Sequence, residues 1–189
     1  SAVSLFNDAQ ATGAIYDYEN EVYGETGLLL GTRVSARGGN ARTQFYLAGG
    51  YLNEDGIVKH TGYKRYDLRA NVRHQVNDRI ALGFTSYFVN SDADRGLTNN
   101  DNTGTTYGIS LAFTPGFVEL HPDAGGNYPD NPFASSNVLQ TRDLVRNNES
   151  TYRTINGLDL KALLQRNGRS VTRLVGRGGF DFYSIHTIG

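Results

Sequence analysis

Apolar and polar residues alternate along most of this chain with a period of two, which is typical of β-strands whose two faces meet different surroundings. The clearest example is residues 66–72, where Leu68 and Val72 alternate with Asp67 and Arg69. The pattern predicts six strands of about ten to twelve residues, at 28–36, 42–52, 64–75, 79–90, 154–165 and 173–182. Each predicted strand has one mainly apolar face and one polar or charged face.

Short and long connections alternate between these strands. Tight-turn signals occur at Gly38-Gly39-Asn40, Val76-Asn77-Asp78 and 166–169, whereas 53–63 and 91–150 are long and polar. Strands of this length fit tilted bilayer spans, with tight turns on one side of the membrane and long loops on the other. A soluble β-sandwich is the alternative, because its strands alternate too.

Two stretches do not read as spanning strands. Residues 105–120 alternate like a strand, but one further span there would put the last tight turn on the wrong side of the membrane. We therefore predict that 91–150 is one long outward loop in which 105–120 is a short helix or a non-spanning strand. Residues 1–26 are read as an approach segment, and 27–183 as a partial β-barrel.

The alternation also predicts which side chains lie on each face of a membrane-spanning sheet. The predicted lumen-facing residues are Arg33, Asp67, Arg69, Asn71, Arg73, Asp159, Lys161, Arg173, Arg177 and Asp181. The predicted lipid-facing residues are Leu28, Leu30, Phe45, Leu47, Leu68, Val72, Leu82, Phe84, Leu160 and Phe180. Opposite charges in the lumen can pair to hold the wall or an internal plug, and contact with a solute is the alternative role.

Composition and motifs narrow the chemistry. A net charge of −1 argues against general nucleic-acid binding, and the absence of Cys excludes disulfides and thiolate metal sites. The four His residues lack metal-ligand spacing. Calcium held by Asp92, Asp94 and Asp101 is an alternative to a solvated outward loop, although Thr103 stands where a calcium loop has Glu. We otherwise predict no metal, no cofactor, no catalytic residue and no enzyme activity.

A family resemblance rests on residues 49–72, which contain GGYLNEDGIV, then TGYKRY, then RANV. This run resembles the early barrel of the SusC/RagA family, the TonB-linked outer-membrane transporters of Bacteroidetes. Further similar stretches occur in the family's order, at Asp17 to Gly27, Val76-Asn77-Asp78, Gly126-Asn127-Tyr128 and Asn131-Pro132. The resemblance covers roughly residues 16 to 183.

The resemblance implies an all-β fold, in which about six antiparallel strands belong to a transmembrane barrel of about 22. The family's plug domain and TonB box have no counterpart here, so the sequence is expected to be an excerpt of a transporter. The family imports oligosaccharides or peptides across the bacterial outer membrane with a SusD-like lid lipoprotein and energy from TonB. A small complete barrel of about eight strands with a structural or adhesive role, and a soluble β-rich carbohydrate-binding module, are the alternatives.

Overall fold

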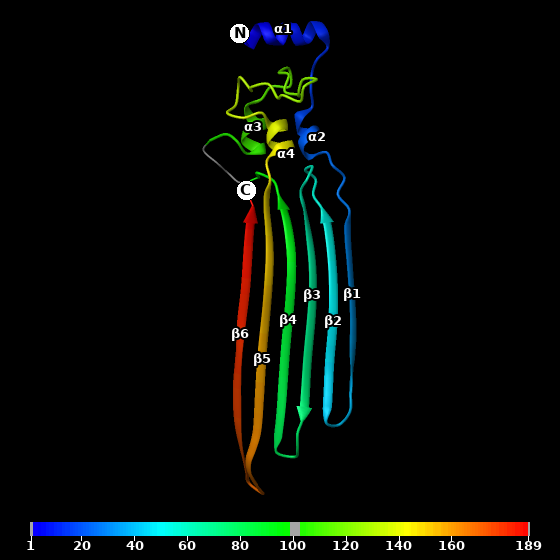
Figure 1. The fold of residues 1–189 in the computed structure, drawn as a ribbon, viewed down its shortest axis with the longest axis vertical. Coiled ribbons are helices and arrows are strands. Elements are labelled where there is room, and N and C mark those ends of the chain that lie inside the picture. Colours follow the sequence, from blue (N-terminus) through cyan, green and yellow to red (C-terminus); the bar gives the residue numbers. More distant parts are fainter. Residues whose placement is uncertain (1, 99–102, 189) are drawn as a thin grey trace.

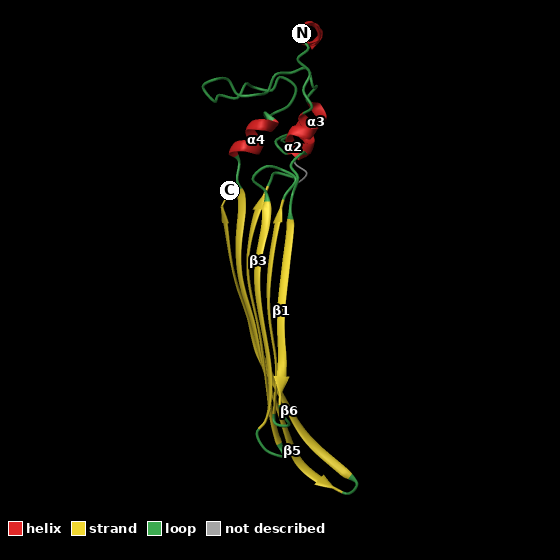
Figure 2. Ribbon diagram, turned by 90° about the vertical axis from the view of Figure 1, so that its right-hand side faces the viewer, coloured by secondary structure: helices red, strands yellow, loops and turns green. Residues whose placement is uncertain are grey.

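The computed structural model describes residues 2–98 and 103–188. Its main element is one antiparallel sheet in which each strand pairs with the next in sequence. The strands are β1 (Leu29–Gly39), β2 (Thr43–Asp55), β3 (Gly62–Gln75), β4 (Ile80–Arg95), β5 (Asn147–Asn167) and β6 (Ser170–Ile188). The sheet is a single curved layer, and the helices lie beyond one of its ends (Figures 1 and 2). The prediction of six antiparallel strands is confirmed.

Four helices accompany the sheet. They are α1 (Ala2–Thr12), α2 (Tyr18–Tyr23), α3 (Tyr107–Phe113) and α4 (Val138–Leu144). Of the two alternatives for residues 105–120, the structure shows the short helix, α3. Among the helices within the described ranges, none is long and apolar enough to cross a bilayer.

Several strands are longer than the sequence pattern predicts. β4 continues to Arg95 and β5 begins at Asn147, so the long connection is 96–146 rather than 91–150. Apart from Ala93, residues 91–95 and 147–150 are polar on both faces, which removes the alternating signal. Their backbones nevertheless pair, because Ser91 to Arg95 face Thr151 to Asn147 in register.

Each of the three tight turns is built around one asparagine. Asn77 Oδ1 accepts hydrogen bonds from the backbone N–H groups of Arg79 and Ile80, both at 2.9 Å. Asn40 and Asn167 make the same pair of bonds to the residues two and three positions ahead. An Asn side chain that accepts hydrogen bonds from the backbone N–H groups of a turn favours a tight reversal of the chain. The sequence of each turn follows the pattern Asn-x-Arg.

The pairing register divides the sheet into two faces, because residues directly opposite each other on paired strands point to the same side. We call one side the polar face: it carries the even-numbered residues of β2 and the odd-numbered residues of the other strands, as far as a bulge between Leu163 and Gln165. The opposite side is the apolar face.

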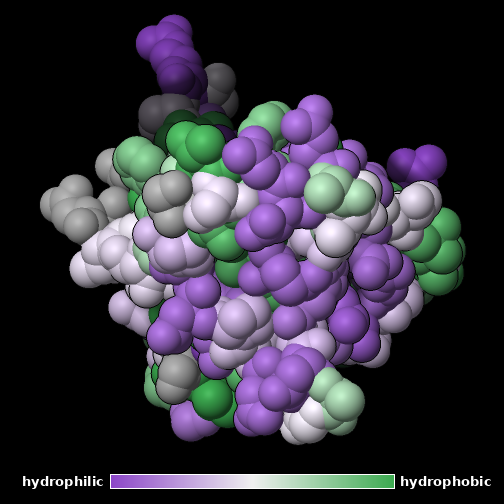
Figure 3. Space-filling model, turned by 90° about the horizontal axis from the view of Figure 1, so that it is seen from above, coloured by the Kyte–Doolittle hydropathy of each residue, from purple (hydrophilic) through white to green (hydrophobic). Residues whose placement is uncertain are grey.

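Helices α2, α3 and α4 and their flanking segments form a small folded unit, which we call the cap, with its own hydrophobic core. Val22 of α2, Tyr107 of α3 and Leu139 of α4 pack there with Val58 from the β2–β3 connection and Leu120. All five side chains are buried. Seen from this end, much of the visible surface of the molecule is hydrophilic (Figure 3). The cap joins residues 16–23, 56–61, 97–98 and 103–145 at the end of the sheet opposite the tight turns (Figure 1).

Candidate functional site: the two faces of the sheet

The apolar face exposes large hydrophobic side chains along the sheet. Val34, Leu68, Leu158 and Phe180 are each more than 60% exposed. An apolar surface of this extent on a folded protein marks contact with lipid or with another protein. A row of tyrosines crosses the cap end of this face, where Tyr51 lies opposite Tyr66, with ring centroids 5.0 Å apart, and Tyr152 lies in the same row.

Charged residues are absent from the lower part of the apolar face. A row here means the residues that pair side by side across the six strands. Between the row of Tyr152 and the row of Ala162, the described strands carry no Asp, Glu, Lys or Arg on the apolar face. Charges return above the tyrosines, at Lys64 and Asp92, which are paired in register. Tyrosine at the border between an apolar band and charged residues is typical of a membrane–water interface.

The polar face holds a buried carboxylate between two arginines. Asp67 Oδ1 lies 2.9 Å from Arg33 Nη2 and 3.5 Å from Arg65 Nη2, and the Asp67 side chain is 1% exposed. Arg33 is on β1 and Asp67 on β3, so the pair crosses β2 at Gly50. A Cβ on Gly50 would lie 2.6 Å from Asp67 Oδ1 and 3.0 Å from Arg33 Nη2. The missing side chain at Gly50 therefore allows this ion pair.

Two further ion pairs join β5 to β6 on the polar face. Arg177 Nε lies 2.9 Å from Asp159 Oδ1, and Arg153 Nε donates to Asp181 Oδ1 at 3.0 Å. Across β3 and β4, the Arg69 guanidinium stands 5.3 Å from the centre of the Tyr87 ring. Charged side chains on neighbouring strands thus form ion pairs along the polar face.

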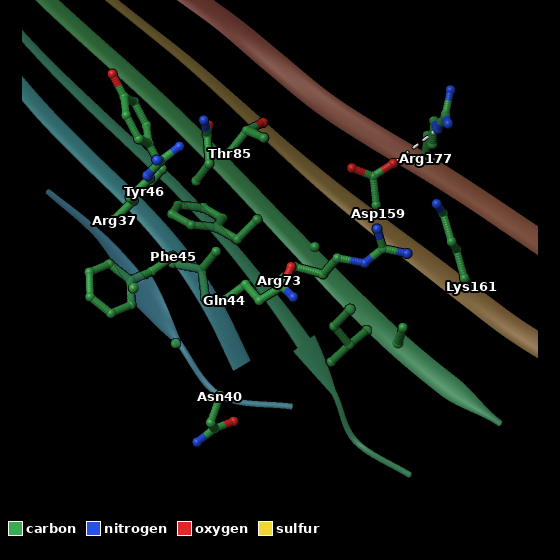
Figure 4. Close-up of a pocket in the computed structure, with 18 residues that line it drawn as sticks. Arg37, Asn40, Gln44, Phe45, Tyr46, Arg73, Thr85, Asp159, Lys161 and Arg177 are labelled. Carbon is green, nitrogen blue, oxygen red and sulfur yellow. Dashed lines mark ion pairs between the residues drawn. The ribbon is translucent and has the colours of Figure 1, made fainter. Parts of the chain in front are cut away.

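A basic hollow of about 850 Å³ lies at the tight-turn end of the sheet. Its lining includes Arg37, Arg73, Lys161 and Arg177, with Asp159 as its one carboxylate. Figure 4 shows these side chains on different strands around the hollow, with the Arg177–Asp159 pair marked. This surface can attract an anion, because positive charges outnumber negative ones.

A polar network holds the cap together. His121 Nε2 lies 2.8 Å from Glu21 Oε2 and His121 Nδ1 lies 2.6 Å from Glu119 Oε1. Burial lowers the pKa of His121, but hydrogen bonds to these two carboxylates outweigh burial, and the pKa is raised above 6.5. The His121 bridge therefore connects α2 to the segment that follows α3.

A second carboxylate in the cap is held by several donors. Asp143 accepts from Arg142 Nε at 2.9 Å and from the Tyr128 hydroxyl at 2.8 Å, and Lys59 Nζ lies 3.6 Å from Asp143 Oδ1. Burial raises the pKa of Asp143, but Arg142 and Tyr128 outweigh it and lower the value to about 2. Asp143 is thus ionised at neutral pH and connects α4 to Lys59 in the β2–β3 connection.

The structure places the sequence-predicted residues in two groups. All ten residues predicted to face a lumen lie on the polar face. Of the residues predicted to face lipid, nine lie on the apolar face and Leu28 precedes β1. The medium that each face meets stays a prediction.

Some members of the polar face were missed in the sequence. Arg65 is two positions before Asp67 and therefore lies on the same face of the strand, so the alternating pattern alone could have identified it. Arg37 and Arg153 lie just beyond the predicted ends of their strands. The His121–Glu21 contact in the cap carries no local sequence signal, because the two residues are 100 positions apart.

The calcium alternative gains no support from the geometry. Asp92 and Asp94 are on β4 rather than in a loop, and Asp92 accepts a hydrogen bond from Ser150 Oγ. Asp101 lies outside the described residues. Within 2–98 and 103–188, no group of three or more His, Asp or Glu side chains is placed to hold a metal ion.

Comparison with known proteins relates the chain to transport receptors. The TonB-dependent receptor P3 of Formosa agariphila is 28% identical over 169 residues, which cover 77% of this chain and 16% of that receptor. The TonB-dependent receptor P26 of the same organism is 28% identical over 116 residues, covering 61% of this chain and 12% of that receptor. No family model matches the chain.

A solved structure shares the fold. A chain of the RagAB peptide importer, in its closed-closed state, superposes with a TM-score of 0.67 at 15% identity, over 92% of this chain and 19% of that chain. The chain thus spans less than a fifth of the proteins it matches. These findings confirm the predicted likeness to TonB-dependent transporters of the SusC/RagA kind: the chain is similar to a segment of two such receptors and shares the fold of part of a RagAB chain.

Proposed function

We propose that this chain is part of the wall of a SusC-type TonB-dependent transporter, which imports oligosaccharides or peptides across the bacterial outer membrane. The observation that carries the proposal is the charge-free part of the apolar face, between the levels of Tyr152 and Ala162, which lies directly behind a charged polar face on the same six strands. Lipid outside and water inside are the two media that this arrangement suits.

The height of the apolar face supports this proposal. From Tyr152 to Ala162, β5 advances ten residues, or about 33 Å at 3.3 Å per residue. A strand tilted by about 40° spans about 25 Å over that length, which is the height of the apolar band in outer-membrane barrels. The tyrosine row would then lie at the outer interface, and the cap would lie outside the membrane.

Barrel closure requires strands beyond this chain. β1 and β6 are the two edges of the sheet, and each pairs on one side only within the described strands. Unpaired backbone groups are too costly in lipid to remain, so further strands must continue the sheet at both edges. We propose a closed barrel of about 22 strands, in which residues 27–183 are part of the wall and residues 96–146 face outward.

The remaining partners follow from this proposal. Residues 1–26 lead the chain through the cap into β1, and the plug and TonB-binding part belong to other regions of the transporter. A SusD-like lipoprotein would cover the barrel on the cap side. This is supported by similarity to TonB-dependent receptors and by the shared fold with a RagAB importer chain.

Uptake in intact cells tests the proposed function. A strain lacking the gene of the full-length protein is compared with its parent for uptake of a panel of labelled oligosaccharides and peptides. We expect uptake of at least one solute to fall to background in the deletion strain and when the proton gradient is dissipated. A small neutral solute that enters through porins is the control. Equal uptake of every panel member by both strains would contradict the proposal.

A further inference from the structure

All of the positive charge on the polar face of β1 and β3 comes from arginine. Five arginines lie there, and we call them the arginine stripe: Arg33, Arg37, Arg65, Arg69 and Arg73. We compared these arginines with the polar-face residues at the same levels of the described strands β1 to β3. Asp67 is the one carboxylate among them. Five guanidinium groups beside one carboxylate leave an excess of four positive charges.

The single carboxylate is already engaged and hidden. Asp67 pairs with both Arg33 and Arg65 and is 1% exposed, so it does not neutralise the rest of the stripe. Arg37, Arg69 and Arg73 are exposed, and no carboxylate of the described residues lies within 4.0 Å of their guanidinium groups. Three guanidinium groups are thus available to another molecule.

The polar face of β5 and β6 provides an internal comparison. There Arg153 pairs with Asp181 and Arg177 pairs with Asp159. These two ion pairs join β5 to β6, and in each pair the carboxylate neutralises the arginine. Lys161 and Arg173 of the same two strands have no ion-pair partner among the described residues, so four cations stand there against the carboxylates of Glu149, Asp159 and Asp181. The excess of positive charge is therefore larger on β1 and β3 than on β5 and β6.

The surroundings of the stripe suit a solute. β2 runs between β1 and β3, and its residues beside the stripe include the small Ala48, which pairs with Arg69, and Gly50, over which Arg33 reaches Asp67. Tyr46 lies beside Arg37 in one row, and Tyr87 lies under Arg69 at 5.3 Å. Guanidinium groups form paired hydrogen bonds with carboxylate and sulfate groups, and tyrosine rings offer a stacking surface and a hydroxyl.

We propose that the arginine stripe is a track for an anionic solute that carries carboxylate or sulfate groups. From Arg65 to Arg73 it extends over eight residues of β3, or about 27 Å, so a solute moving along the wall meets a guanidinium group at successive levels. The inference rests on the proposed function, since it takes the polar face as the wall of a transport lumen.

The test measures binding to the full-length purified transporter, with uptake measured separately. Two pairs of probes are compared: a uronic-acid trisaccharide with its methyl ester, and a glutamate-containing peptide with its glutamine counterpart. The test variant combines Arg37→Gln, Arg69→Gln and Arg73→Gln. The control variant combines Arg42→Gln, Arg79→Gln and Arg169→Gln, which remove the same charge from the three tight turns.

We expect the unmodified protein to bind the charged member of at least one pair about tenfold or more tightly than its neutral partner. The pair that responds identifies the source of the anionic group. The test variant should lose this preference and most of the salt dependence, whereas the control variant should keep both. Absence of a charge preference would overturn the inference.

Two other outcomes are also decisive. If the test variant lost binding of charged and neutral probes equally, the inference would be overturned. The arginine stripe would then bind an acidic part of the protein itself. A charge preference in binding without any uptake would support the stripe as an anion site and contradict the transport function. The two proposals therefore fail separately.

Discussion

A glycine determines how the most buried carboxylate of the polar face reaches its cation. Arg33 reaches Asp67 across β2, and the route passes over Gly50, where any side chain would collide with both groups. Asp67 is almost fully buried, so it cannot move aside without losing its partners. A buried carboxylate that loses its cation is left with an unfavourable desolvation cost.

Gly50→Ala should therefore destabilise the protein. We expect the free energy of unfolding of the full-length protein in lipid vesicles, measured by urea titration, to fall by about 1–3 kcal/mol. Gly178→Ala is the matched control, because a Cβ there meets nothing within 4 Å. The control should leave stability unchanged or raise it by less than about 1 kcal/mol. Equal effects of both substitutions would contradict the account of Gly50.

The His121 bridge should make the cap sensitive to pH. Because the pKa of His121 is raised in the folded state, the bridge contributes its full stability below the unfolded-state pKa near 6.5 and loses it as pH rises through the folded-state value. A histidine NMR titration of the full-length protein should give a pKa above 6.5 for His121, and Glu119→Gln should lower it. Glu25→Gln is the control, and an equal shift in both variants would contradict the bridge.

At the scale of elements, the tight turns depend on one side chain each. In a sharp reversal, some backbone N–H groups find no backbone carbonyl as partner. The Oδ1 atoms of Asn40, Asn77 and Asn167 accept hydrogen bonds from these N–H groups instead. The third residue of each turn is an arginine, which gives this end of the sheet a positive rim.

Asn77→Ala should lower the free energy of unfolding by about 1 kcal/mol, since it removes two backbone-to-side-chain hydrogen bonds. The urea titration in vesicles measures this as well. Asp78→Ala changes the neighbouring exposed side chain of the same turn and should have an effect below about 0.5 kcal/mol. If Asp78→Ala were the more damaging substitution, the turn would not depend on Asn77.

The sheet could be predicted from the sequence because strand alternation is a local signal. Each of the six strands places its apolar residues at every second position, so both the strands and the faces of their side chains follow from parity. The strand ends could not be predicted, because residues such as Ser91 and Asp92 are polar on both faces and pair only through their backbones.

The ion pairs and the cap were less accessible to prediction. Parity placed Asp67 and Arg33 on one face, but the contact across Gly50 depends on the strand register, which the tight turns set. The cap core joins Val22, Tyr107 and Leu139, which are far apart in sequence and lie in short helices without a repeating pattern. Such contacts are decided by tertiary packing rather than by local preference.

At the scale of the whole molecule, the sheet has no core of its own. It is one layer, and most residues of β1 and β6 are exposed on both faces (Figure 2). The cap has a buried core, but the sheet needs a medium for its apolar face and strands for both its edges. The proposed membrane and larger barrel would supply both requirements, in keeping with a chain that spans 16% of its relative P3.

The most direct test of this account is to place spin labels at Leu68 and Arg69 of the full-length protein in lipid bilayers. The two residues are neighbours on β3 and lie on opposite faces of the sheet. Relaxation by a lipid-soluble reagent should be strong at position 68 and weak at position 69, and relaxation by a water-soluble reagent should show the reverse. The opposite result at both positions, or equal access of the water-soluble reagent to both, would contradict the central claim that the sheet separates lipid from an aqueous lumen.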